Sequence, residues 1–220
     1  MKNFIQKFQV TFIVMISLIS LSLTSFAAKN YQAGFNMTDL NSTEDLSELL
    51  SYFQIKYDNW IKSVSDLFNE IKKGDCRLSI ENGILHRHVE GVAIKCFYIN
   101  SQGERFQLFE EKQVFKNGRV REGGHPFVAE KLQFNESPEQ GALRGLAEEL
   151  QISGPDVHVI SLPKENKCDT IDCPTYKGIQ STYNTAVFYC EIPDSHYRSF
   201  YIEEQEDKQT FFSWIKIDNK

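Results

Sequence analysis

The sequence has no cluster of basic side chains interleaved with aromatic ones, the pattern by which many proteins bind nucleic acid. Its 24 Lys and Arg residues are outnumbered by 30 Asp and Glu residues, which gives a formal net charge of −6. Such a chain gains little affinity from counterion release at a phosphate backbone. We therefore expect no nucleic-acid partner. Internal repeats and low-complexity segments are also absent, which argues against a solenoid or a disordered tail.

Long apolar runs are scarce as well. The main one, residues 8–23, follows Lys2 and Lys7 and is shorter than the roughly 20 residues that a membrane span needs. Small residues at Ser25 and Ala27 suit a signal peptidase. The pattern predicts a signal peptide over residues 1–27, export to the periplasm or medium, and no stable membrane span after cleavage; a retained anchor is the alternative. Cleavage removes two basic residues and no acidic ones, which leaves a net charge of −8.

The five cysteines give no zinc pattern, because no second close pair and no His at ligand spacing accompany Cys168 and Cys173. Exported thiols often form disulfides, and an odd number leaves at least one thiol over. Cys168 and Cys173 either close a small loop or stay unpaired. Cys96 and Cys190 lie in apolar runs, so we expect them in the core.

The N-terminal third is expected to be helical after a polar linker over residues 28–42. Apolar residues then recur at spacings of three and four through residues 43–74, which is typical of amphipathic helices. Ser42 or Thr43 is suited to cap the first helix, and Gly74 to end the second. The sequence thus predicts a helical N-terminal subdomain over residues 43–74, ahead of a larger domain over residues 75–220.

The larger domain carries strand patterns on both sides of one helix. Asn82-Gly83 predicts a tight hairpin within residues 79–89. Further strands are expected at residues 91–100, 105–115, 127–134, 157–162, 184–192 and 211–217. Strands before and after a helix, without regular alternation, favour an α+β fold with a mixed sheet and helices against it.

The helix between these strands has a clear start. Ser137 is suited to cap it, Pro138 to occupy its first turn, and Gln140 to complete a capping box. The Gly154-Pro155 pair is expected to stop it. Its apolar stripe is expected to be Leu143, Leu146 and Leu150.

Residues 130–152 resemble the Nudix box, Gly-x5-Glu-x7-Arg-Glu-U-x-Glu-Glu-x-Gly-U, where U is aliphatic. Six of the nine specified positions are met, by Glu136, Arg144, Leu146, Glu148, Glu149 and Ile152. The resemblance implies a Nudix-type α/β/α sandwich with a mixed sheet. It also implies Mg²⁺ or Mn²⁺ as cofactor, since these hard cations take carboxylate oxygens and substrate phosphates as ligands.

By the same resemblance, Glu148 and Glu149 would ligate the metal, with the backbone carbonyl of Glu130 as a further ligand. Arg144 would orient the carboxylates, and Glu136 would hold the loop, so that Glu136, Arg144, Glu148 and Glu149 form the expected catalytic set.

Three positions depart from the box: Glu130 and Gln151 replace glycines, and Gly145 replaces the first helical glutamate. That glutamate binds metal or accepts a proton in many Nudix enzymes. Glu203 or Glu204, in an acidic stretch before the last expected strand, or Glu130 itself, are candidates to replace it.

A weaker similarity covers residues 70–217, including Lys73-Gly74-Asp75-Cys76-Arg77-Leu78 and the run from Arg144 to Leu150. It looks like an uncharacterised Nudix-like group of plants and algae, and it implies that glycine after the arginine is that group's pattern. Arg119 and Arg121, near the box loop, are candidates to contact substrate, as are Glu203 and Glu204.

The resemblance therefore implies a metal-dependent hydrolase that cleaves the pyrophosphate bond of a nucleoside diphosphate linked to another group. The alternative is a non-catalytic Nudix-fold module that binds a nucleotide or a protein. The family analogy also allows a homodimer.

Overall fold

The computed structural model describes residue 31 and residues 36–218. Residues Met1–Phe35 and Asn36–Lys220 are separate units, and the second contains all the elements described below. The predicted signal peptide lies outside the described residues. Part of the predicted linker is among the described residues and is structured. It contains the short helix η1 (Met37–Asp39), followed by Leu40, which is only 1% exposed. The backbone N–H of Leu78 also donates to the sulfur of Met37, at 3.2 Å.

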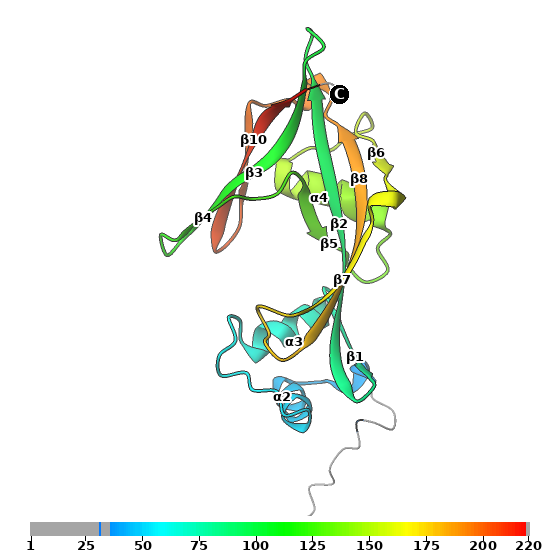
Figure 1. The fold of residues 1–220 in the computed structure, drawn as a ribbon, viewed down its shortest axis with the longest axis vertical. Helices are drawn as coiled ribbons and strands as arrows, with labels where there is room; N and C mark the ends of the chain where they lie inside the picture. Colours follow the sequence, from blue (N-terminus) through cyan, green and yellow to red (C-terminus); the bar gives the residue numbers. More distant parts are fainter. Residues whose placement is uncertain (1–30, 32–35, 219–220) are drawn as a thin grey trace, which may run out of the picture. The chain divides into compact units, whose positions relative to one another are not determined.

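The described residues form one ten-stranded sheet whose main path is β6-β8-β2-β3-β10-β9 (Figure 1). β2 (Ile84–Ile99) and β8 (Gln180–Glu191) run parallel, whereas the other pairs are antiparallel. The remaining strands on the path are β3 (Arg105–Phe115), β6 (Val159–Ser161), β9 (Phe200–Glu204) and β10 (Lys208–Ile217). The predicted α+β class with a mixed sheet is confirmed.

The hairpin at Asn82-Gly83 is confirmed, since Glu81 of β1 (Arg77–Glu81) pairs with Ile84 of β2. Both turn residues have positive φ, 51° and 78°, as a two-residue hairpin turn requires. One expectation is wrong here: the strands foreseen on either side of Glu90 are a single strand, β2. It pairs first with β1, then with β5 (Val128–Lys131), and finally with β3.

Three strands were not predicted. β4 (Val120–Glu122) pairs with β3, and β7 (Lys167–Asp172) pairs with β8. β9 takes up Glu203 and Glu204, which the sequence placed in a loop. Segments β4 and β7 are mostly polar and exposed, so their partner strands and not their own hydrophobic pattern determine that they are extended.

Helix α4 (Pro138–Leu150) packs on one face of the sheet and contacts β2, β5, β6 and β9. Ala142, Leu146 and Leu150 join a buried cluster with Val92, Ile94 and Cys96 of β2 and with Phe188 and Cys190 of β8. Leu143 was expected in this stripe but is 37% exposed. The helix therefore presents a narrow apolar face and leaves room beside it for polar side chains.

The N-terminal helices are α2 (Thr43–Tyr52) and α3 (Val64–Lys73), each with a complete capping box. The second helix begins later than expected, at Val64 and not near Trp60, because Ser63 and Asp66 form its cap. Both helices belong to the same compact unit as the sheet, so the predicted boundary after residue 74 does not divide that unit. None of the described helices is long and apolar enough to span a membrane.

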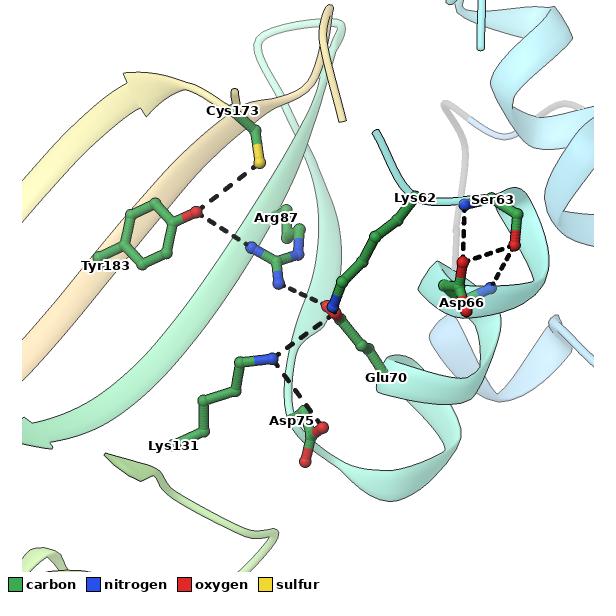
Figure 2. A network of polar contacts seen from close by, with 9 residues as sticks. All are labelled: Lys62, Ser63, Asp66, Glu70, Asp75, Arg87, Lys131, Cys173 and Tyr183. Atoms are coloured by element: carbon green, nitrogen blue, oxygen red, sulfur yellow. Dashed lines mark hydrogen bonds and ion pairs between the residues drawn. The ribbon is translucent and has the colours of Figure 1, made fainter. Parts of the chain in front are cut away.

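A buried ion pair connects α3 to the sheet (Figure 2). The guanidinium of Arg87 on β2 lies 2.6 Å from the carboxylate of Glu70 on α3. Lys62 donates to the same carboxylate at 2.8 Å, and the amine of Lys131, at the end of β5, lies 3.6 Å from it. Burial alone would raise the pKa of Glu70, but these three cations outweigh it and lower the pKa to about 2. Glu70 is therefore a permanently charged structural residue.

All five cysteines are free thiols. Cys96 and Cys190 are buried in the core as predicted, on neighbouring strands. The suggested loop between Cys168 and Cys173 is not closed: Cys168 is exposed on β7, whereas Cys173 is buried. The hydroxyl of Tyr183 lies 3.7 Å from the sulfur of Cys173.

Candidate functional site

Arg144 is the centre of the box loop. Its Nε donates to Glu136 Oε1 at 2.8 Å, and its Nη2 donates to Glu136 Oε2 at 2.9 Å and to the carbonyl of Lys131 at 2.7 Å. Its Nη1 donates to Glu148 at 2.9 Å and lies 3.3 Å from Glu130. These hydrogen bonds lower the pKa of Glu136. Arg144 therefore ties the loop, the strand β5 and the helix α4 together, as the resemblance implied.

The sequence places this helix accurately at its start and less so at its end. Ser137 accepts from the N–H of Gln140, whose side chain accepts from the N–H of Ser137. The helix ends at Leu150 and not at Gly154, because Gln151 adopts a left-handed conformation with φ 58°. This glutamine stands where the box has glycine, and it keeps the glycine's backbone role at some conformational cost.

The two adjacent glutamates expected to ligate the metal have different surroundings. The Glu148 side chain is 55% exposed and is held by Arg144. Glu149 is 8% exposed and faces the interior. Burial and the charges of Glu203, Glu130 and Glu110 raise the pKa of Glu149 to about 9, against the opposing charge of Lys208. Glu149 is thus coupled electrostatically to Glu110, Glu130 and Glu203, and we call these four side chains the carboxylate cluster. Glu149 and Glu110 are its buried members.

The space beside Gly145 is filled by side chains from outside the helix. A Cβ atom built there would lie 3.0 Å from the Cβ of Glu130 and 3.5 Å from its Cγ. The side chain of Glu130, on β5, therefore lies directly over the helix position where the box has glutamate. Burial raises the pKa of Glu130, although Arg144 acts to lower it. The substitution that weakened the sequence motif is the one that makes room for this second carboxylate.

Glu110 was not predicted as a site residue. It lies on β3, is 9% exposed, and is paired with Arg121 at 3.0 Å. A β-bulge skips Glu111 and sets Glu110 opposite Phe212 of β10. Gly124 packs so closely that a Cβ there would lie 2.6 Å from the Cβ of Glu110. An inward-facing charge in the middle of an alternating strand was the only sequence signal for this residue.

The remaining predicted substrate residues divide between the cluster and the surface. Glu203 belongs to the cluster, and Arg121 reaches it through Glu110. Glu204 is exposed and accepts from Gln209 at 3.2 Å. The guanidinium of Arg119 lies 4.0 Å from the ring centroid of Phe115, and no contact between Arg119 and the cluster is found among the described residues.

A large hollow lies mostly apart from the carboxylate cluster. It has a volume of about 600 Å³ and is lined by the face of β2 and β8 that points away from α4, including Ala93, Lys95 and Val187. Of the carboxylate cluster it includes only Glu130. We locate the candidate site by its carboxylates and not by the volume of a hollow. Carboxylate oxygens bind divalent cations, and a bound cation attracts a phosphate.

The donor chemistry of the carboxylate cluster fits a hard divalent cation, because all four side chains offer oxygen. The charges of Glu203, Glu130 and Glu110 disfavour the ionised form of Glu149, and a cation would relieve that repulsion. Within residues 31 and 36–218, however, no three His, Cys, Asp or Glu side chains are already arranged to hold a metal ion. Of the four carboxylates only Glu130 lies near a cationic group of the helix, since Arg144 is 3.3 Å from it and also pairs with Glu136 and Glu148.

No protein-family model and no curated protein matches the chain. Several solved structures are similar at low identity. An Ap4A hydrolase from C. elegans has 12% identity and a TM-score of 0.33, over 58% of this chain and 80% of that one. A MutT/nudix family protein from Enterococcus faecalis has 14% identity and a TM-score of 0.37, over 79% of this chain and 57% of that one. A Nudix hydrolase from M. smegmatis has 14% identity and a TM-score of 0.33, over 63% of this chain and 78% of that one. These TM-scores are low, so the proposals below rest on this chain's own residues.

Proposed function

We propose that this protein is a metal-dependent hydrolase that cleaves the pyrophosphate bond of a nucleoside diphosphate linked to another group, with Mg²⁺ or Mn²⁺ as cofactor. The observation that carries the proposal is the position of Glu130 over Gly145, beside the buried Glu149. The chain thereby has a glutamate side chain beside the helix position where the degenerate box lacks one.

Each residue of the site has a role that its contacts support. Glu149, Glu130 and Glu203 would hold the cation, with Glu148 at the exposed side. A bound divalent cation would polarise the phosphate oxygens and withdraw charge from the bond that breaks. Arg144 orients Glu136 and Glu148 through charge-assisted hydrogen bonds. Arg121, whose side chain is half exposed beside Glu110, is placed to meet a phosphate.

The raised pKa of Glu130 suits proton transfer. A carboxylate whose pKa is above its ordinary value is a better acceptor for a proton from an attacking water than an exposed glutamate is. Glu130 also lies within reach of Arg144, which can stabilise its charged form. In this proposal Glu130 takes over the general-base or ligand role that Gly145 cannot supply.

The test is turnover across a panel of nucleoside diphosphates linked to sugars, nucleotides or alcohols, with Mg²⁺ and Mn²⁺. We expect phosphate-bond cleavage that requires the metal and is lost in Glu149→Gln. Glu139→Gln is the matched control, because Glu139 is an exposed glutamate in the first turn of the same helix. Absence of turnover with every substrate and both metals would refute the hydrolase.

One observation favours the alternative, a non-catalytic module that binds a nucleotide or a protein: the described side chains do not form a ready metal site. The same panel distinguishes the two. A nucleotide that raises the melting temperature without metal and without turnover would support the binding module.

Export is also part of the proposal and rests on the sequence pattern of residues 1–27. Correct cleavage after Ala27, read from the N-terminus of the exported protein, tests it.

A further inference from the structure

Strand β7 (Lys167–Asp172) has an open edge. It pairs with β8 along one side, from Lys167 opposite Thr185 to Asp172 opposite Gln180. Along its other side, no strand of the described residues pairs with it. All six of its side chains are exposed. An edge of this kind presents unpaired backbone N–H and C=O groups and is a template for pairing with another strand.

The charges on β7 are arranged so that two antiparallel copies of the strand are complementary to each other. Lys167 and Asp169 lie on one face of the strand, on either side of Cys168. If two copies of β7 pair antiparallel with Cys168 opposite Cys168, Lys167 of each copy lies opposite Asp169 of the other. Directly opposite residues in an antiparallel pair point to the same face, so both ion pairs form together. A shift by one residue sets Lys167 opposite Thr170 or opposite Cys168, and both ion pairs are lost.

We propose that a second copy of this chain pairs with β7, antiparallel and about a two-fold axis at Cys168, so that the two sheets become continuous. The self-complementary charge pattern selects a second copy over an unrelated strand, since a two-fold axis applies the same contact twice. This assembly does not depend on the hydrolase, and its test reads assembly and not turnover.

The register makes a geometric prediction about Cys168. Opposite residues in an antiparallel pair have Cα atoms about 4.5 or 5.5 Å apart, according to their hydrogen-bonding position. Both values fall within the range of about 4.4–6.8 Å that a disulfide spans. Cys168 is also the one exposed thiol among the described cysteines, whereas the other four are buried. It therefore serves as a reporter of the interface.

The pairing also relates the two copies of the 600 Å³ hollow, whose rim includes Lys167 and Asp169. Because opposite residues share a face, both hollows would open on the same face of the continuous sheet, on either side of the axis. A single surface with two openings is a further consequence of the register.

The first test is charge exchange, read by sedimentation velocity over a range of protein concentrations. The wild-type chain is expected to dimerise. Lys167→Asp sets like charges opposite each other at two symmetric positions, and we expect the dimer to weaken by about tenfold or more. The double variant Lys167→Asp/Asp169→Lys exchanges the charges, keeps the strand self-complementary and should restore the dimer. Lys177→Asp, the same change at an exposed lysine outside the strand, should leave it intact.

The second test is oxidation of the full chain with copper phenanthroline in air, in which oxygen accepts the two electrons and two protons that the thiols lose. We expect a disulfide dimer that is absent in Cys168→Ser and slowed in Lys167→Asp. Far-UV circular dichroism confirms that each variant is folded. A wild-type chain that stays monomeric at all concentrations would overturn the proposal, as would cross-linking that Lys167→Asp leaves unchanged, which indicates random collision.

Discussion

Two buried glutamates on helices make the most instructive comparison in this molecule. Glu70 on α3 and Glu149 on α4 are each 8% exposed. The pKa of Glu70 is lowered to about 2, whereas that of Glu149 is raised to about 9. Glu70 pairs with Lys62, Lys131 and Arg87, whereas Glu149 is buried where the charges of Glu203, Glu130 and Glu110 outweigh that of Lys208. The two side chains have equal exposed fractions, so the charges of the neighbouring residues determine which of the two glutamates is ionised at neutral pH.

The difference separates a structural role from a functional one. The cations around Glu70 satisfy it completely, and the pair holds α3 to β2. The carboxylates around Glu149 leave it unsatisfied, and a fold does not gain stability from such a group. Strongly perturbed pKa values of this second kind are typical of sites that bind a cation or move a proton. Each of the predictions that follow changes one side of this comparison.

The largest expected effect is on the structural side. Glu70→Ala leaves the guanidinium of Arg87, which is 3% exposed, without its partner. Breaking one half of a buried pair costs about 3–5 kcal/mol of unfolding free energy. Urea unfolding at neutral pH measures this loss. Glu48→Ala, at an exposed position on α2, is the control and should change stability by less than about 0.5 kcal/mol. Equal effects at the two positions would mean that the pair contributes nothing.

The pH dependence should have opposite signs at the two glutamates. Glu70 stabilises the fold above its ordinary pKa of 4.5, and this stability is lost as pH falls toward 2. Between pH 4.5 and about 9, folded Glu149 holds a proton that the unfolded chain has lost. This one group therefore lowers stability by up to about 1.4 kcal/mol per unit rise in pH.

Glu149→Gln removes that second dependence while keeping the side-chain shape. We expect the variant to be more stable than the parent at pH 8, with a flatter profile of unfolding free energy from pH 5 to 9. Thermal and urea unfolding across this range measure both quantities. If parent and variant have parallel profiles, Glu149 is ionised in the folded protein and the comparison with Glu70 fails.

The smallest effects concern the helix caps. Ser63 and Ser137 cap α3 and α4 in the same way, and replacing either with alanine should cost about 1 kcal/mol. The consequences for function should differ, since α4 carries Arg144 and Glu149. We expect Ser137→Ala to weaken Mn²⁺ binding, measured by isothermal titration calorimetry, and Ser63→Ala to leave it unchanged. Equal Mn²⁺ affinity in the two variants would show that the α4 cap does not support the site.

Local chemistry predicted much of the fold. The cap at Ser137, the hairpin at Asn82-Gly83 and the strand at residues 105–115 each depend on residues close in sequence, and all three are confirmed. Strands β7 and β9 were missed because their extended form depends on partner strands and not on their own pattern. The left-handed Gln151 was missed because sequence rules reserve that conformation mainly for glycine.

The site was predictable only in its helical part. Arg144 and Glu148 lie one turn apart on α4, and the resemblance assigned Glu136, in the loop before the helix, to the same group. Glu110 and Glu203 act on the charge of Glu149 from strands β3 and β9, and neither spacing nor composition predicts that coupling. Glu130 was one of several candidates to replace the glutamate missing at Gly145, and the packing of β5 over α4 singled it out.

The central claim, that Glu130 supplies the carboxylate missing at Gly145, is tested most directly by moving that carboxylate back to the helix. Glu130→Gly alone should lower turnover by about 10²–10⁴-fold and weaken Mn²⁺ binding. Glu130→Gly also clears the space 3.0 Å from a Cβ at position 145, so Glu130→Gly/Gly145→Glu should recover turnover and Mn²⁺ affinity to within about tenfold of wild type. A double variant that folds but is as impaired as Glu130→Gly, or a Glu130→Gly variant with full activity, would contradict the account.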